Sequence, residues 1–188
     1  MSGDEASGGP PYWGKFRGKV IDNLDPLQAG RIQASVPGVH RGIPSGWALP
    51  CLPFAGTSMG FYGLPAIGAN VWIEYENGNP DRPIWSGCFP APTDVPPLAQ
   101  PLFLKVMVQT LLGQSLMLDD TPGIGGITLR TATGEVLMMN SLGITLQDAA
   151  GDMLQISPAG IILKTAAGAS IALTGPAVSI NNGALGVL

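Results

Sequence analysis

Apolar residues in the second half of the chain alternate with other residues in short groups that repeat at a fixed interval. The segments 134–140, 151–157 and 168–174 each combine a glycine with two apolar residues separated by one position, and they start 17 residues apart. A second series, at 126–131, 143–148, 160–165 and 177–182, has the same spacing, with Ala177 in place of glycine in its last copy. Such alternation is typical of a strand with one apolar face. The interleaved series therefore predict a strand and a turn every 8 or 9 residues.

An earlier copy of the first series lies at residues 113–120, set back by a four-residue insertion in the loop DDTPGIGG at 119–126. Each 17-residue repeat supplies only two strand-and-turn units, whereas a triangular solenoid made by one chain needs three sides per coil, roughly 18 residues or more. We therefore expect three chains to wind about a common axis, with each chain supplying successive strands to successive faces and no exposed sheet edge. The alternative on periodicity alone is a single-chain β-solenoid or a flat repeat sheet.

The alternating apolar side chains of these strands are predicted to form the core of a trimeric needle. They are Leu129, Leu137, Met139, Ile144, Leu146, Leu154, Ile156, Ile161, Leu163, Ile171, Leu173, Val178 and Ile180. The chain ends in NNGALGVL, which contains no charged residue. Three such ends would gather Leu185, Val187 and Leu188 into one apolar patch, and a patch of this kind predicts a docking surface for another protein.

The first half of the chain has a different pattern, with strand-like runs separated by Gly, Pro or Asn-Gly. The runs are 16–22, 30–37, 47–54, 70–76 and 83–89, and Asn77-Gly78 predicts a hairpin turn between the last two. Five short strands suit a small closed barrel. The predicted organisation is a flexible N-terminal arm at 1–11, a barrel at 12–90, a Pro-rich linker at 91–101 and the needle at 102–188.

Composition supports a folded, all-β protein. Hydrophobic residues make up 45% of the chain and charged residues only 12%, against about 25% charged in an average domain, while 27 glycines and 18 prolines favour tight turns. The net charge is −4 and the basic residues are scattered, so nucleic acid is not expected as a partner. No run of about 18 apolar residues predicts a membrane-spanning helix, so contact with a membrane is expected to be transient.

Few residues suggest chemistry. Cys51 and Cys88 have neither zinc-ligand spacing nor a disulfide framework and are expected to be buried in a protein of the reducing cytoplasm. The only histidine, His40, is expected to be solvated in a loop. Glu74 and Glu76 are expected to lie on the wet side of a strand.

The pair Asp119-Asp120 is expected to form a turn rather than a cation site. Ser45 and Ser58 lie in no nucleophile motif, and a single histidine makes a Ser-His-Asp site improbable. We therefore expect no enzymatic activity, no metal and no cofactor. Five aromatic residues of the barrel could stack on a sugar or a base, but are expected to pack the core or to contact neighbouring protomers: Trp47, Phe54, Phe61, Tyr62 and Trp72.

Three segments of the barrel region share the arrangement of glycines, prolines and tryptophans of a known family. They are GKVIDNLDPLQAGRIQASVPGV at 18–39, SGWALPCLPFAG at 45–56 and GFYGLPAIGANVWIEYENGNPDRPIWSGCF at 60–89. Residues 12–90 closely resemble the barrel of the gp5/VgrG-type spike family of phage baseplates, type VI secretion and extracellular contractile injection systems. The segment SLMLDDTPGIGGITLRT at 115–131 and the repeats after it resemble the triple-stranded β-helix of the same family.

The resemblance implies an OB-fold barrel followed by an intertwined, trimeric β-helical needle that pierces a target membrane. It implies a trimeric hub protein at the barrel end and a PAAR-type tip protein at the needle's end, in a chain made in the bacterial cytoplasm without a signal peptide and built into the baseplate of a phage tail-like particle. The sequence lacks the lysozyme-like insert, the fused hub domain and the terminal His-x-His pair of some members. The alternative function is an OB-fold carbohydrate-binding or adhesive module on a β-helical stalk.

Overall fold

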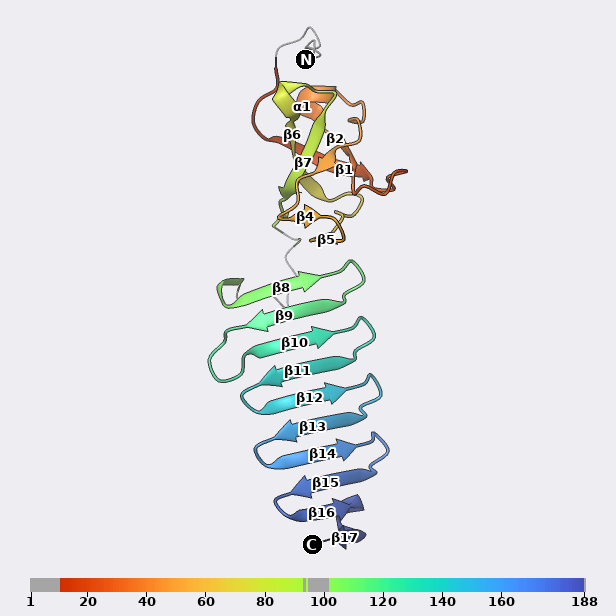
Figure 1. Cartoon of the computed structure of the whole chain (residues 1–188), viewed down its shortest axis with the longest axis vertical. Helices are drawn as coiled ribbons and strands as arrows, with labels where there is room; N and C mark the ends of the chain where they lie inside the picture. The colour runs from red at the N-terminus through yellow and green to blue at the C-terminus, as the bar shows by residue number, and fades with distance from the viewer. Residues whose placement is uncertain (1–10, 93, 95–101, 188) are drawn as a thin grey trace. The chain divides into compact units, whose positions relative to one another are not determined.

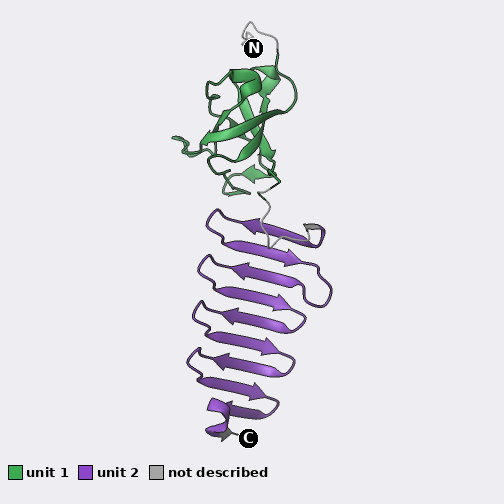
Figure 2. Cartoon of the chain, turned by 180° about the vertical axis from the view of Figure 1, so that it is seen from behind, with its two compact units in different colours: residues 1–95 green, residues 96–188 purple. Residues whose placement is uncertain are grey.

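The computed structural model of the chain describes residues 11–92, 94 and 102–187 and divides the chain into two compact units, residues 1–95 and 96–188 (Figure 2). Both units are built on β-strands, which short turns join in the second unit and longer loops separate in the first (Figure 1). The prediction of an all-β fold is confirmed.

The first unit is built on a five-stranded sheet in the order β2-β1-β6-β7-β3. Neighbouring strands are antiparallel except β3 and β7, which are parallel. An antiparallel bridge between Ile32 and Ala48 joins the start of β2 to the start of β3 and closes the barrel. This connectivity is that of an OB-fold. The strands are β1 (Phe16–Asp22), β2 (Gln33–Ser35), β3 (Leu49–Pro50), β6 (Asn70–Tyr75) and β7 (Pro83–Cys88).

The barrel core follows from strand alternation. Along β6, Val71, Ile73 and Tyr75 are buried while the residues between them are only partly buried, as expected when successive side chains point to opposite faces. Trp85 of β7 enters the same core and its indole nitrogen donates to the Gly30 carbonyl at 3.1 Å. The other buried apolar residues are Val20, Ile32, Ala34, Val36 and Ala48.

Three short elements connect these strands. The turn η1 (Glu76–Gly78) places Asn77 at φ 52° and Gly78 at φ 73°, so the predicted Asn-Gly hairpin turn is confirmed. Helix α1 (Pro37–His40) follows β2 and begins at a proline, a residue well suited to the first turn of a helix. A separate two-stranded hairpin, β4 (Ala55–Gly56) and β5 (Met59–Gly60), precedes β6. The sequence predicted neither the helix nor this hairpin.

The second unit is a single sheet of ten antiparallel strands that follow one another in chain order (Figure 1). A two-residue turn at 141–142 contrasts with the six-residue loop 120–125, which confirms the predicted four-residue insertion. The turn η3 (Leu102–Leu104) precedes β8, and η4 (Asn181–Gly183) precedes β17. The strands are β8 (Lys105–Gln109), β9 (Ser115–Asp119), β10 (Gly126–Arg130), β11 (Val136–Asn140), β12 (Gly143–Gln147), β13 (Met153–Ser157), β14 (Gly160–Lys164), β15 (Ser170–Thr174), β16 (Ala177–Ile180) and β17 (Leu185–Val187).

The path of the chain through this sheet differs from the expectation that successive strands pass to successive faces. Each strand instead pairs with the next strand of the same chain, as Leu137↔Leu146 and Leu154↔Leu163 illustrate. The physical reason is the length of the connections, because turns of two to six residues return the chain antiparallel beside the strand it has just left. Backbone pairing is therefore completed within one chain, and a side-chain face remains to be covered.

The predicted arm and linker lie almost wholly outside the described residues, which lack 1–10, 93 and 95–101. Near the first described residue, the Tyr12 amide donates to the Gly78 carbonyl at 2.9 Å. After the barrel, the Ala91 amide donates to the Asp94 carboxylate at 2.7 Å and closes a turn.

Candidate functional site

One face of the ten-stranded sheet presents two continuous rows of apolar residues, here called the aliphatic face. Alternation within each strand puts two of its residues on this face, and the antiparallel register aligns them from strand to strand. The first row is Val106, Leu118, Ile127, Met139, Ile144, Ile156, Ile161, Leu173 and Val178. The second row is Val108, Leu116, Leu129, Leu137, Leu146, Leu154, Leu163, Ile171 and Ile180.

All the residues predicted for the needle core lie on the aliphatic face. The sequence reasoning missed its first members, which are Val106, Val108, Leu116, Leu118 and Ile127. The signal was present, because KVMVQ at 105–109 and SLMLD at 115–119 alternate in the same way. Their burial between three chains stays a prediction.

The aliphatic face is uncovered in the single chain. Leu146 is 53% exposed, Leu163 50% and Ile144 41%. Single soluble chains rarely leave an apolar surface of this extent open to water, and a sheet with one apolar face must pack against a second layer. The face therefore requires a partner along its whole length.

The opposite face is mixed, because polar and apolar side chains share its central row, whereas the aliphatic face presents two apolar residues in every strand from β8 to β16. The central row of the opposite face includes Thr128, Thr145 and Gln155, and near its start Lys105 lies 3.4 Å from the carboxylate of Asp119. The same row also carries Met107, Met117 and Met138. The aliphatic face is therefore the more apolar side of the sheet, and its inward packing in a trimer stays a prediction.

The long loops at one side of the sheet share a capping device. In the loops that begin at Thr131, Asp148 and Thr165, the side-chain oxygen accepts the backbone amide four residues later at 2.8–3.1 Å. The Thr110 loop repeats the contact with Gln114 at 3.1 Å. The sequence reasoning missed this function, although a Thr or Asp three residues before each loop glycine marks it.

Glycine is required where one strand begins beside the next. Gly143 has φ 130°, and a Cβ built there would lie 2.0 Å from the Ile156 carbonyl oxygen. Gly160 has φ 138° and the same relation to the Leu173 carbonyl at 2.1 Å. The glycine at the head of these repeats thus allows adjacent strands to approach closely.

The pair Asp119-Asp120 lies where β9 ends and the loop 120–125 begins, so only Asp120 is in the predicted turn. The Asp119 carboxylate accepts the amide of Thr121 at 2.9 Å and also its hydroxyl. These bonds from Thr121, with Lys105 nearby, lower the pKa of Asp119. The Asp120 amide donates to the Leu104 carbonyl at 2.8 Å.

A buried ion pair that the sequence reasoning missed fixes the loop between β1 and β2. The guanidinium of Arg31 contacts both carboxylate oxygens of buried Asp25 at 2.6–3.1 Å. The same carboxylate accepts the amides of Leu27 and Ala29 at 3.0 and 2.8 Å. These hydrogen bonds, that of Arg31 first, hold the pKa of Asp25 well below its usual range. No motif around Asp25 signalled this network.

The prediction that His40 is a solvated loop residue is wrong. His40 ends α1, is partly buried, and its Nε2 lies 3.0 Å from the hydroxyl of Tyr75. Burial lowers the pKa of His40 and raises the pKa of Tyr75 to about 12. His40 therefore packs against Tyr75, a residue of the barrel core.

The prediction that both cysteines are buried is wrong, since Cys51 and Cys88 are exposed. Cys51 follows the short strand β3 and Cys88 is the last residue of β7, so each lies where its strand stops covering the core. Of the predicted wet-side acids, Glu74 lies 3.1 Å from Lys15, while Glu76 has left the strand for η1.

The five aromatic residues were expected to pack the core or to contact neighbouring protomers, and most of them do not pack the core. Trp47 and Trp72 lie beneath the guanidinium groups of Arg31 and Arg17, with ring centroids at 5.6 and 5.4 Å. The other three point to solvent, with exposed fractions of 53% for Phe54, 52% for Phe61 and 69% for Tyr62. Contact with neighbouring protomers remains the other expectation for them.

Ser45 and Ser58, the two serines that lie in no nucleophile motif, have different surroundings. Ser45 is buried, where its hydroxyl accepts the Ala34 amide at 3.0 Å and donates to the Gly46 carbonyl at 2.8 Å. Ser58 is exposed at the tip of the β4–β5 hairpin with φ 59°. Within the described ranges no cluster of His, Cys, Asp and Glu could hold a metal ion. No helix in the described part of the chain has the length and apolar character needed to cross a bilayer.

The predicted tip residues lie at the end of the sheet. Leu185 belongs to β17 and is 57% exposed. Val187 pairs with Val178 by register, and Leu188 lies outside the described residues. Docking at this end stays a prediction.

Comparisons with known families match both units. The family described as the type VI secretion system/phage-baseplate injector OB domain matches residues 16–89. The family described as the phage baseplate V C-terminal trimerisation domain matches residues 105–151 and again residues 141–186. A comparison with curated proteins gave no match.

Proposed function

The chain belongs to the gp5/VgrG-type spike proteins of phage baseplates and type VI secretion systems, and we propose that it is the puncturing device of a contractile injection machine. A homotrimeric baseplate spike follows from the OB domain and the trimerisation domain. The proposal adds a mechanical task for the trimer, which is to breach the target membrane when the machine contracts.

The observation that carries the proposal is the unbroken aliphatic face. Three such faces packed together would give a shaft with a continuous apolar interior and the mixed face outside, in which every strand is already hydrogen-bonded within its own chain. Apolar interiors pack as densely as organic crystals and deform little under load. A shaft of this kind suits force transmission, and we include in the proposal that the chain catalyses no reaction.

The proposal extends to location and partners. We propose synthesis in the bacterial cytoplasm and incorporation into a baseplate, with the barrel seated on a trimeric hub protein and a PAAR-type protein on the needle's end. Leu185 supports the tip contact, because its apolar side chain is 57% exposed and its burial by a partner would lower the free energy of the complex.

The puncturing role can be tested in assembled particles with two neighbouring substitutions. Leu154→Asp places a carboxylate on the aliphatic face, whereas Gln155→Asp places one on the opposite face of the same strand. Particles produced with Leu154→Asp should lack an intact spike trimer and release no dye from vesicles even where the sheath contracts, while particles with Gln155→Asp should match the wild type. Equal dye release from both variants would contradict the proposal.

The tip contact has its own test. Deletion of Leu185 to Leu188 should abolish co-purification of a co-expressed PAAR-type protein with the trimer. Leu142→Ser is the matched control, because Leu142 is 69% exposed in a turn between β11 and β12 and lies outside the proposed contact. Full retention of the partner by the deletion variant would place the docking surface elsewhere.

A further inference from the structure

A long part of the barrel sequence carries no charge although much of it is exposed. Residues 42–73, between Arg41 and Glu74, contain no Asp, Glu, Lys, Arg or His. Depletion of charge together with exposed aromatic and Met residues is the compositional mark of the core of a protein interface. The exposed large apolar side chains of this stretch are Ile43, Leu49, Phe54, Met59, Phe61, Tyr62, Leu64 and Ile67.

The β4–β5 hairpin projects from the barrel within this uncharged stretch. Its two strands pair only with each other, through Ala55↔Gly60 and Gly56↔Met59. Residues 53–59 are all exposed, and Phe54, Met59 and Phe61 are 52–58% exposed. A two-stranded hairpin is marginally stable in water without further packing, so this hairpin requires a cover.

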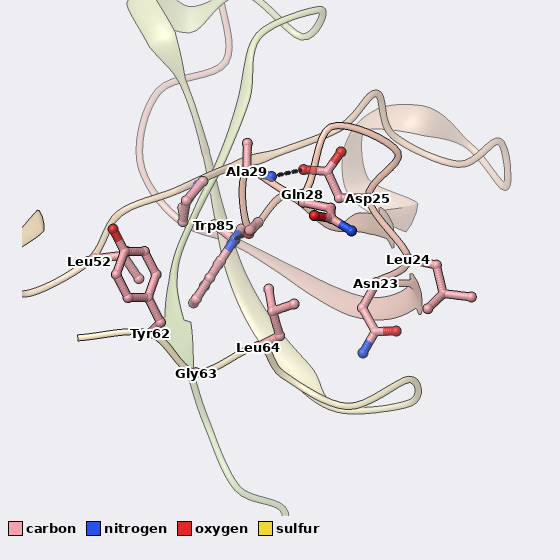
Figure 3. Close-up of a pocket in the computed structure, with 12 residues that line it drawn as sticks. Asn23, Leu24, Asp25, Gln28, Ala29, Leu52, Tyr62, Gly63, Leu64 and Trp85 are labelled. Atoms are coloured by element: carbon pink, nitrogen blue, oxygen red, sulfur yellow. Dashed lines mark hydrogen bonds between the residues drawn. The ribbon is translucent and has the colours of Figure 1, made fainter. Parts of the chain in front are cut away.

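The barrel also carries a concave counterpart, here called the barrel hollow (Figure 3). It is an open space of about 800 Å³. Figure 3 shows Leu52, Tyr62, Leu64 and Trp85 around it, with the loop of Asn23 to Ala29 along one side. The one carboxylate in its lining, Asp25, already pairs with Arg31, so the hollow suits apolar rather than charged contacts.

The trimer supplies an occupant for this hollow. In a threefold ring each subunit meets its two neighbours through two different patches, in directions about 60° apart. The uncharged stretch contributes to two such patches, which are the projecting hairpin and the hollow; Tyr62 and Leu64, two and four residues after β5, line the hollow. We propose that the β4–β5 hairpin of each protomer inserts into the barrel hollow of the next protomer.

The tether between the units favours this contact over one with free protein. Residues 95–101 connect Asp94 to Leu102, a distance of at most about 28 Å for an extended chain. Three barrels joined in this way to one trimer face each other at effective concentrations in the millimolar range. The inference depends on the homotrimer and not on the puncturing role.

The contact can be tested by photo-crosslinking of the purified full-length chain without other baseplate proteins. Benzoylphenylalanine at Phe61, in the hairpin region, should give covalent dimers and trimers that persist in guanidinium. Peptide mapping should place the new bonds in segments 23–30, 50–52 or 62–64 of another protomer. The matched control is the same group at Trp13, an aromatic residue that is 66% exposed outside the uncharged stretch and should give no such bonds.

A second variant separates the contact from the trimer itself. Leu64 lines the hollow and its side chain is 49% exposed, so a barrel with Leu64→Asp should still fold. Crosslinking from position 61 should fall at least about tenfold, while native mass spectrometry should still show a trimer. Crosslinking only within one chain, only after baseplate proteins are added, or equally from position 13 would overturn the inference. A monomeric sample would instead contradict the trimer.

Discussion

Leu154→Asp is the substitution to which the proposed needle should be most sensitive. Leu154 lies on the aliphatic face in mid-sheet, between Leu146 and Leu163 of the adjacent strands. Loss of a packed Leu side chain costs about 2–5 kcal/mol, and an unpaired buried carboxylate adds several kcal/mol or is driven to its neutral form. Threefold symmetry triples each effect, so the total reaches roughly 15–30 kcal/mol per trimer when the carboxylates stay charged.

This loss exceeds the whole stability of many domains, so the variant should not form trimers at micromolar concentration at pH 7. Burial would raise the pKa of the introduced carboxyl group above its value in the unfolded chain, so the penalty should shrink as the pH falls toward 4. Native mass spectrometry and thermal unfolding at both pH values measure the effect. Gln155→Asp, on the opposite face, should shift the melting temperature by less than about 3 °C. A Leu154→Asp trimer that melts within the same margin of the wild type would refute an inward-facing Leu154.

Three further predictions concern single residues. Gly143→Ala should lower the melting temperature of the needle more than Gly168→Ala, because a Cβ at Gly143 meets a carbonyl oxygen at 2.0 Å while one at Gly168 meets no atom within 4 Å; equal shifts in calorimetry would contradict this. Arg31→Met should destabilise the barrel above about pH 4. The pKa of Asp25 is lowered in the folded state, so the stabilisation by the ion pair is present above the unfolded pKa and is lost as the pH falls. An unchanged free energy of unfolding at pH 7 would contradict this prediction. Burial lowers the pKa of His40, so the barrel should lose stability as the pH falls below about 6.5, and His40→Asn should flatten that dependence in denaturant titrations.

The repeat made the needle strands predictable from the sequence. Alternation of two apolar residues and a fixed 17-residue spacing located strands such as β12 and β13, and turn length alone accounts for the four-residue insertion before β10. The pairing partners were harder, because a period records how often strands recur but not which strand each one pairs with. Connection length decides this, and two-residue turns such as 141–142 compel pairing within the chain.

The barrel shows where sequence reasoning stops. The strands were found from punctuation, but the Asp25–Arg31 pair and the His40–Tyr75 contact join residues whose proximity depends on how loops return to the barrel. The exposure of Cys51 and Phe54 was missed for a related reason, since β3 ends at Pro50 and the chain then leaves the barrel sheet for the β4–β5 hairpin. Residue type suggested burial, and the short strand prevented it.

The aliphatic face makes the assembly state the central claim, and the mass of the purified full-length chain tests it most directly. Native mass spectrometry at low micromolar concentration should give one species near three times the 19.4 kDa of a single chain. Circular dichroism of the same sample should show β-structure. A folded, stable species of 19.4 kDa would contradict the account, because the rows that run through Leu146 and Ile144 would then remain open to water in a protein that needs no partner.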